Sequence, residues 1–136
     1  MQYTVCQELR KGAMRMTRGL GLDLCGIARM EKLLEDERFL NRYFSGDEIS
    51  YIRSKGKGAA QTMAGIYAAK EAFGKALGTG ITFDLRNVSI LHDGEGRPEY
   101  ALSGDALALA GEDRFLLSIT HDGGVAAAVC VREDYR

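Results

Sequence analysis

The spacing of apolar and polar residues divides the chain into short elements. Leucines at every second position give 17–25 the two-residue period of a β-strand. Apolar residues then recur at the spacing of an amphipathic helix over 27–34. Ser45 and Glu48 match a capping box, which predicts the start of another short helix running through Ile52. The first part of the chain is therefore expected to hold one strand followed by helices.

A longer helix is predicted over 59–77, where small and helix-favouring residues form a run. Gly78 or Gly80 can end this helix in a left-handed conformation. The rest of the chain is richer in strand patterns. It predicts one short helix and four strands, at 103–110 and at 88–91, 100–102, 115–119 and 125–131. The expected fold class is α+β, with helices packed on a mostly antiparallel sheet that the first strand joins.

The last two predicted strands, 115–119 and 125–131, show little alternation between polar and apolar residues. They are therefore expected to be buried on both faces or to lie at an interface between subunits. With 136 residues, of which 46% are hydrophobic and 27% charged, the chain fits one soluble globular domain.

Nothing in the sequence predicts export or membrane insertion. No apolar run approaches the ~18 residues that a membrane span needs, and the N-terminus lacks the apolar run of a secretion signal. The widely spaced Cys6, Cys25 and Cys130 form no disulfide framework or zinc pattern. The expected location is the reducing cytoplasm.

Charge is unevenly distributed, although the formal net charge is only −1. Residues 1–75 contain 13 Lys/Arg and 9 Asp/Glu, whereas 76–136 contain 5 and 10. The basic first half predicts a local surface for an acidic partner or for phosphates. The excess is far too small to indicate a protein that binds duplex DNA.

Two charged positions on the long predicted helix suggest chemistry. Glu71 and Lys75 lie one turn apart on one face, among small residues that allow close approach. That face offers a metal ligand and a positive charge for a phosphate, although an exposed ion pair would give the same spacing. Asp23, at the far end of the first strand, could hold a cation or cap the following helix.

Four segments occur in a fixed order along the chain. They are Gly19–Asp23, Phe39–Arg42 with Glu48 after it, Ala68–Gly80 and Ser118–His121. Together they resemble the holo-acyl-carrier-protein synthases, the short class of 4′-phosphopantetheinyl transferases, over about 17–132. The resemblance implies one transferase domain at 17–136, after an N-terminal extension at 1–16. It also implies a homotrimer that binds coenzyme A in clefts between subunits.

The family moves 4′-phosphopantetheine from coenzyme A to a serine of apo-acyl carrier protein, in fatty acid biosynthesis. It uses Mg²⁺ and releases adenosine 3′,5′-bisphosphate. By match of motif, Asp23 and Glu71 are the expected Mg²⁺ ligands, which suits the preference of this ion for oxygen. Lys75 resembles the phosphate-contacting lysine of the family. Glu71, or a water held on the metal, is expected to remove the serine proton.

Further residues match the coenzyme side of the family site. The resemblance implies coenzyme contacts for Lys70, Gly78, Gly80, Ser118 and His121. For His121 the expected contact is with the nucleotide, and an acid–base role comes second. Lys70 points roughly 100° away from Glu71 on an ideal helix, so another contact or solvent fits it equally well.

The resemblance assigns a docking role to Arg29, Arg38 and Arg42, which match a basic surface that receives the acidic helix of acyl carrier protein. Phe39 would pack into that contact. A solvated charged face over a small aromatic core also fits these residues, but the positive first half favours docking. One departure is Ile66, where many relatives carry a basic residue, so one phosphate contact is expected to be absent or supplied elsewhere.

Other functions remain open from the residues alone. A non-catalytic adaptor could bind acyl carrier protein through the arginines, with Asp23 only a helix cap. Another Mg²⁺-dependent phosphoryl transferase is disfavoured because the chain has no phosphate-binding GxxxxGK[ST] loop and no dinucleotide fingerprint. A serine hydrolase using Ser118 and His121 is disfavoured because the two lie close in sequence, without a nucleophile elbow.

Overall fold

The computed structural model describes residues 15–135, and 1–14 and 136 lie outside it. Cys6 and nearly all of the predicted N-terminal extension are therefore not described. The last two residues of that extension, Arg15 and Met16, form the start of β1 (Arg15–Gly26). The first strand thus begins earlier than its hydrophobic pattern predicts.

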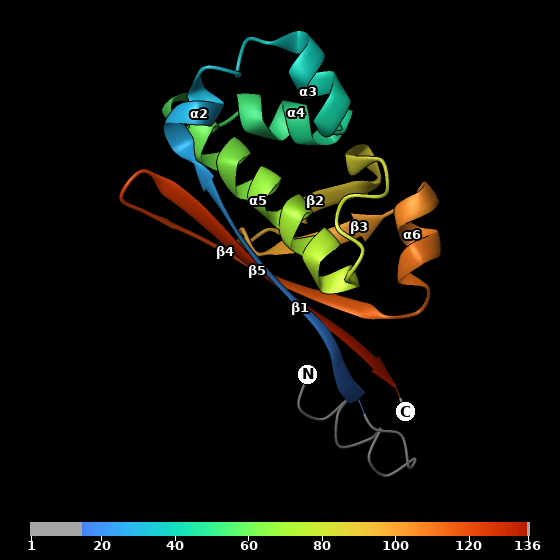
Figure 1. Cartoon of the computed structure of the whole chain (residues 1–136). Coiled ribbons are helices and arrows are strands. Elements are labelled where there is room, and N and C mark those ends of the chain that lie inside the picture. The colour runs from blue at the N-terminus through green and yellow to red at the C-terminus, as the bar shows by residue number, and fades with distance from the viewer. Residues whose placement is uncertain (1–14, 136) are drawn as a thin grey trace.

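Two antiparallel sheets form the β part of the fold (Figure 1). In the larger sheet, β5 (Val125–Tyr135) lies between β1 and β4 (Arg114–Asp122) and pairs with both. The smaller sheet is the hairpin of β2 (Val88–His92) and β3 (Pro98–Leu102). The predicted strands and their antiparallel pairing are confirmed, and β1 pairs with β5 as the expected link to the later strands, but the strands form two sheets where one was expected.

Three short helices gather at one end of the molecule: α2 (Ile27–Glu31), α3 (Glu37–Tyr43) and α4 (Gly46–Arg53) (Figure 1). The first is shorter than predicted because the chain turns after Glu31. The second was not predicted as a helix. Its N-cap is Asp36, whose side chain accepts a hydrogen bond from the backbone nitrogen of Phe39 at 3.1 Å.

The long helix α5 (Ala59–Leu77) forms as predicted and crosses one face of the larger sheet (Figure 1). Gly78, at φ +85°, ends it in the left-handed conformation. A short 3₁₀ helix, η1 (Gly56–Gly58), precedes α5. A second one, η2 (Leu85–Asn87), ends the connection from α5 to β2. The last helix, α6 (Gly104–Ala110), follows the hairpin.

Glycines let β1 lie directly against α5. A Cβ atom on Gly21 would come within 1.8 Å of the backbone oxygen of Ala72, and one on Gly19 within 2.0 Å of that of Ala76. Only glycine therefore fits at these two points. The contact places the end of β1, where Asp23 lies, beside the second half of α5.

The opposite face of the larger sheet is apolar, and nothing within residues 15–135 covers it. Leu20, Leu22 and Leu24 of β1 are 64%, 59% and 66% exposed. On the covered face, Ala126, Ala128 and Cys130 of β5 are buried under α5. Residues 15–135 of a single chain therefore do not bury the last two strands on both faces, which leaves the alternative that these strands lie at an interface.

Candidate active site

The candidate active site lies where the second half of α5 faces β1. Glu71 and Lys75 share one face of α5. The ammonium of Lys75 donates hydrogen bonds to the backbone oxygen of Leu22 at 2.8 Å and to Asp23 Oδ1 at 3.2 Å. The Lys75 side chain is still 53% exposed, so it can reach a ligand. The fold thus brings together the Asp23 carboxylate and the Lys75 ammonium, which are distant in the sequence.

The charges of both predicted carboxylates act on the buried thiol of Cys25. Burial raises the pKa of this thiol, Arg29 lowers it, and Asp23 and Glu71 each raise it further. Both carboxylates therefore lie within electrostatic range of one atom. The alternative role of Asp23 as a helix cap is wrong, because Gly26 precedes α2 and makes no side-chain cap.

The donor set at this site fits Mg²⁺. This ion usually takes one or two protein carboxylates, and water and substrate phosphates complete its octahedron. Asp23 and Glu71 supply two carboxylates at a partly exposed surface. Within 15–135 no three His, Cys, Asp or Glu side chains are grouped as a metal site. A cation here would therefore need oxygen atoms from water or a substrate.

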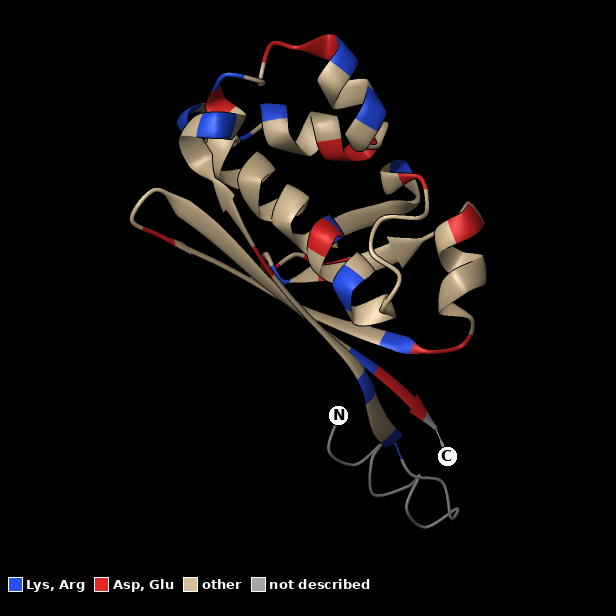
Figure 2. Ribbon diagram, in the orientation of Figure 1, with Lys and Arg blue, Asp and Glu red and all other residues tan. Residues whose placement is uncertain are grey.

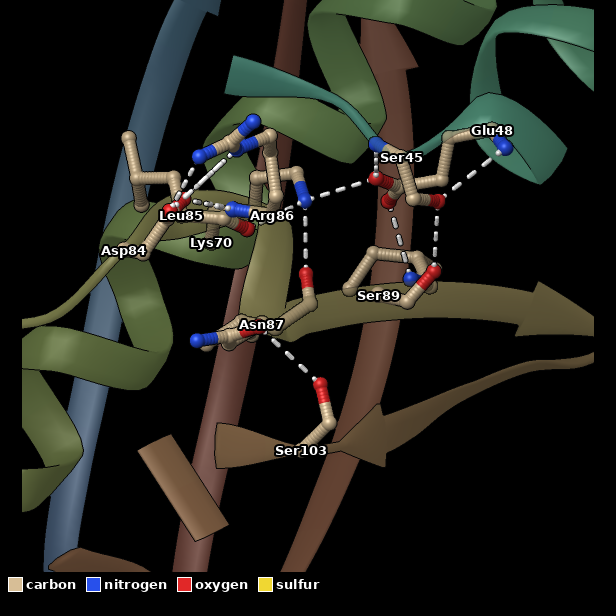
Figure 3. A network of polar contacts seen from close by, with 11 residues as sticks. Ser45, Glu48, Lys70, Asp84, Leu85, Arg86, Asn87, Ser89 and Ser103 are labelled. Atoms are coloured by element: carbon tan, nitrogen blue, oxygen red, sulfur yellow. Dashed lines mark hydrogen bonds and ion pairs between the residues drawn. The ribbon is translucent and has the colours of Figure 1, made fainter. Parts of the chain in front are cut away.

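Lys70, although next to Glu71 in sequence, belongs to the core (Figure 3). Its side chain is fully buried, and its ammonium donates to Glu48 Oε1 at 2.7 Å and to the backbone oxygens of Leu85 and Val88 at 2.8 and 2.6 Å. Burial lowers the pKa of Lys70, and the Glu48 carboxylate opposes that shift. The predicted coenzyme contact of Lys70 is corrected accordingly, because all three donors are occupied away from the surface.

The Glu48 carboxylate connects this buried lysine to two further elements. Besides Lys70, Glu48 accepts hydrogen bonds from the backbone nitrogens of Ser45 and Ile90, both at 2.9 Å. The hydroxyls of Ser45 and Ser89 are 3.0 Å apart (Figure 3). The capping box predicted from the sequence is present, and it also anchors β2 and α5. This network holds Lys70 on a buried side of α5, whereas Glu71, the next residue, is partly exposed.

The predicted docking residues meet on α2 and α3, where Figure 2 shows basic segments. Arg38, Phe39 and Arg42 line one pocket of about 330 Å³. Phe39 packs against Tyr43, with ring centres 4.8 Å apart. The Arg29 guanidinium lies 5.3 Å from the ring centre of Tyr67 on α5. The basic residues therefore stand on an aromatic cluster that reaches α5.

The sequence as a whole matches one known family. The model of the 4′-phosphopantetheinyl transferase superfamily matches residues 19–130. The chain belongs to this superfamily. Curated holo-[acyl-carrier-protein] synthases of Treponema denticola and Clostridium acetobutylicum are 43% and 40% identical to it, over 122 and 123 residues. Each alignment covers 87% of this chain, and 99% and 98% of the respective relative.

Solved structures of superfamily members share the fold. The holo-[acyl-carrier-protein] synthase of Neisseria meningitidis superposes with a TM-score of 0.76 at 33% identity, covering 88% of this chain and all of that chain. The Helicobacter pylori enzyme, solved in complex with coenzyme A, gives 0.73 at 32%, covering 83% and 98%. These structures confirm the α+β architecture of helices and antiparallel sheets. Among the helices within 15–135, none combines the length and apolar character of a membrane span.

Residues matching the coenzyme side of the transferase family fall in two places. His121 Nε2 lies 3.0 Å from Gln61 Nε2, at a pocket of about 250 Å³ that Tyr51 and His92 also line. Ser118 instead lies beside Val129 on the uncovered sheet face. The two residues thus occupy opposite faces of β4, which excludes a serine–histidine pair within one chain and contradicts the hydrolase alternative.

The glycines at the end of α5 adjoin the candidate transferase site. Gly78 and Gly80 are both exposed and have φ values of +85° and +67°. The backbone nitrogens of Gly78 and Gly80 donate to the backbone oxygens of Lys75 and Gly74, so two hydrogen bonds connect this turn to the helix that carries Lys75. The predicted coenzyme contacts of these glycines, of Ser118 and of His121 stay predictions.

One residue at this site was missed from the sequence. Tyr67 precedes Glu71 by one helical turn and shares its face of α5. A tyrosine four positions before a candidate metal ligand is the signal that could have identified it.

Proposed function

We propose that this chain transfers 4′-phosphopantetheine from coenzyme A to a serine of apo-acyl carrier protein and releases adenosine 3′,5′-bisphosphate. The proposed reaction takes place in the cytoplasm and serves fatty acid biosynthesis. The observation that carries the proposal is the contact of Lys75 with Asp23 where α5 faces β1, with Glu71 one turn before Lys75 on the same face of α5. The names of its relatives and the coenzyme A bound to the Helicobacter pylori enzyme support it.

Each of these side chains has a chemical role in the proposal. Asp23 and Glu71 would hold Mg²⁺, which when bound would polarise the phosphate under attack and balance charge on the leaving bisphosphate. Lys75, fixed by Leu22 and Asp23 yet half exposed, would contact a phosphate oxygen of coenzyme A. The carboxylate of Glu71 would accept the proton of the attacking serine.

The docking surface is proposed to receive acyl carrier protein. Arg29, Arg38 and Arg42 offer positive charge to an acidic helix, and Phe39 offers an apolar contact between them. All four lie on α2 and α3, at the end of the molecule where α5 begins, and Glu71 lies further along α5 (Figure 1). A carrier protein bound there would approach the candidate site along α5.

A homotrimer is proposed because the uncovered face of the larger sheet needs a partner. Leu20, Leu22 and Leu24 form a row of exposed leucines, and Val129 and Val131 border the same face. Contiguous apolar surface of this kind marks an interaction site. Three copies joined through this face would bury it and would leave clefts between subunits for coenzyme A.

The activity is tested by the intact mass of an apo-acyl carrier protein after incubation with this protein, coenzyme A and Mg²⁺. We expect the mass of one phosphopantetheine group to be added, and a chelator to prevent it. The Glu71→Gln variant should lose activity by about 10³-fold, since it removes both a ligand and the proton acceptor. Binding of the carrier protein without any mass gain would instead support the adaptor.

The assembly is tested by light scattering after size exclusion. We expect the mass of three chains for the wild type, and smaller species for Leu22→Lys, which places a charge on the uncovered face. Leu107→Lys is the matched control, because Leu107 is 50% exposed but lies on α6. A monomeric wild type, or a Leu22→Lys variant of unchanged mass, would contradict the trimer.

A further inference from the structure

A pocket of about 450 Å³ lies between α3 and the segment that joins α5 to β2. Its two walls are close together because α3 contacts η2. Arg42 and Tyr43 of α3 line this pocket, and they also line the smaller pocket that Arg38 and Phe39 form. The docking surface proposed for the carrier protein therefore continues from α3 toward η2.

The residues that line this pocket combine apolar surface with positive charge. Ile81, which is 41% exposed, and Phe83 contribute apolar surface on the η2 side. Arg42 contributes a guanidinium over the ring of Tyr43, and within residues 15–135 no carboxylate pairs with it. Arginine and aromatic residues are enriched where proteins bind one another. The pocket therefore suits a partner that offers an apolar side chain beside a carboxylate.

Arg86, on the η2 side of the pocket, already holds a carboxylate from its own chain. Its Nε donates to Asp84 Oδ1 at 3.1 Å, and its terminal nitrogen donates to Asp84 Oδ2 at 2.6 Å (Figure 3). The side chains of Arg86 and Asp84 are 55% and 34% exposed, so water reaches both. An exposed ion pair contributes little to stability. A carboxylate from a partner can therefore replace Asp84 on Arg86 without disturbing the fold.

The backbone that carries Arg86 is held in place by groups from two helices. The buried ammonium of Lys70 donates to the backbone oxygens of Leu85 and Val88, at the start of η2 and just after it. Asp105 of α6 accepts a hydrogen bond at 3.0 Å from the backbone nitrogen just before η2. A wall that is already ordered loses little conformational entropy when a partner binds.

We propose that this pocket is a second contact for acyl carrier protein. An acidic side chain of the carrier protein replaces Asp84 on Arg86, and a neighbouring apolar side chain packs on Ile81. This inference rests on the proposed function. The carrier protein is the occupant because the pocket continues the surface proposed to receive its acidic helix, and because Arg42 and Arg86 offer positive charge from both walls. Asp84 thus competes with docking.

The first measurement is the affinity for a carrier protein whose acceptor serine is alanine, titrated by calorimetry without coenzyme A. We expect Arg86→Ala to weaken binding about fivefold, because a cation of the interface is lost. Asp84→Asn should strengthen binding about threefold, because it removes the competing charge. Asparagine keeps an oxygen for the backbone nitrogen of Arg86, which Asp84 accepts from at 2.9 Å.

The matched controls carry the same changes of charge at another exposed ion pair. Arg97 and Asp93 lie in the turn between β2 and β3, with their charged groups 3.7 Å apart, and neither lines this pocket. Arg97→Ala and Asp93→Asn should each stay within about twofold of the wild type, because screening weakens the effect of distant surface charges. They separate a contact at the pocket from an effect of net charge.

A second pair of variants tests the apolar part of the contact. Ile81→Ser should weaken carrier-protein binding about fivefold, since it removes apolar surface that the partner would cover. Leu91→Ser is the matched control, because Leu91 on β2 is 40% exposed and does not line the pocket. It should stay within about twofold of the wild type.

Titration of coenzyme A against the same variants tests the alternative that Arg86 binds a phosphate of the coenzyme. Weaker coenzyme binding in Arg86→Ala, with unchanged affinity for the carrier protein, would overturn the inference. Equal carrier-protein affinity in wild type, Arg86→Ala and Asp84→Asn would also overturn it, whereas transfer by the wild type would leave the proposed function standing. A wild type that binds the carrier protein with the expected dependence on Arg86, yet transfers no phosphopantetheine, would support the docking contact and refute the proposed function.

Discussion

Lys70 and Lys75 lie five residues apart on the same helix and have opposite surroundings. The side chain of Lys70 is 0% exposed and that of Lys75 is 53% exposed. Five residues correspond to a rotation of roughly 140° around a helix, which separates the core side of α5 from its open side. The same residue type therefore stabilises the fold at one position and is available to a ligand at the other.

The difference follows from how each charge is compensated. Transfer of an ammonium out of water is unfavourable unless close partners replace the lost hydration. Lys70 has the Glu48 carboxylate and two backbone oxygens, which use its three donors. Lys75 has Asp23 and the oxygen of Leu22 while it remains hydrated. Its exposed ion pair contributes only ~0–1 kcal/mol to stability, so moving it toward a phosphate requires little free energy.

The largest expected effect comes from Lys70→Met. This change leaves Glu48 buried without its counter-charge, so the free energy of unfolding should fall by about 3–5 kcal/mol. Urea denaturation followed by circular dichroism measures the loss. Lys75→Met is the matched control on the same helix and should stay within about 0.5 kcal/mol of the wild type. Similar losses in both variants would contradict the contrast between the two lysines.

Lys75→Gln should give the next largest effect, on activity alone. Loss of a charge aimed at the phosphate should lower kcat/KM by about 10²-fold with unchanged stability. The mass-based transfer assay at several coenzyme A concentrations provides the measurement, and the unfolding curve serves as the control. Full transfer activity in Lys75→Gln would remove this lysine from the site.

Ser45→Ala should have a smaller effect, confined to the core network. The substitution removes the oxygen that accepts from the backbone of Glu48 and contacts Ser89, so the free energy of unfolding should fall by about 1 kcal/mol. Combined with Lys70→Met, its effect should not be additive, because both changes act on Glu48. Strict additivity in the denaturation data would indicate that cap and ion pair are independent.

Arg38→Ala should have the smallest effect, on the open surface. Rim charges act mainly on association, so the on-rate for acyl carrier protein should fall a few-fold at low salt and match the wild type at high salt. Stopped-flow fluorescence at two ionic strengths tests this. Arg97→Ala, in the turn between β2 and β3, is the control. Equal effects of the two variants would argue against docking at α3.

Local patterns were sufficient for elements whose signals lie within the element. The capping box at Ser45, the glycine end of α5 and the alternating leucines of β1 were all predicted correctly. The helix α3 was missed because its residues were interpreted as an aromatic cluster, and its cap at Asp36 was not recognised. The prediction for 27–34 was too long because apolar spacing continues into the turn that follows α2.

The position of Lys70 could not be predicted from helix periodicity. Such reasoning assumes one buried face, but α5 contacts both sheets and other helices and is buried on most sides. The partners of Lys70 come from Glu48 and from backbone near β2, which no spacing within α5 reveals. Likewise, the meeting of Asp23 with Lys75 depends on the packing of β1, and only the family resemblance anticipated it.

The absence of a side chain at Gly21 has a consequence for how the enzyme can fail. A Gly21→Ala substitution would push β1 and α5 apart, because the added methyl group would overlap the backbone oxygen of Ala72. Every reactive group would still be present, yet the two halves of the site would stand apart. Inactivation would then arise from separation alone, with no change in the chemistry of any functional side chain.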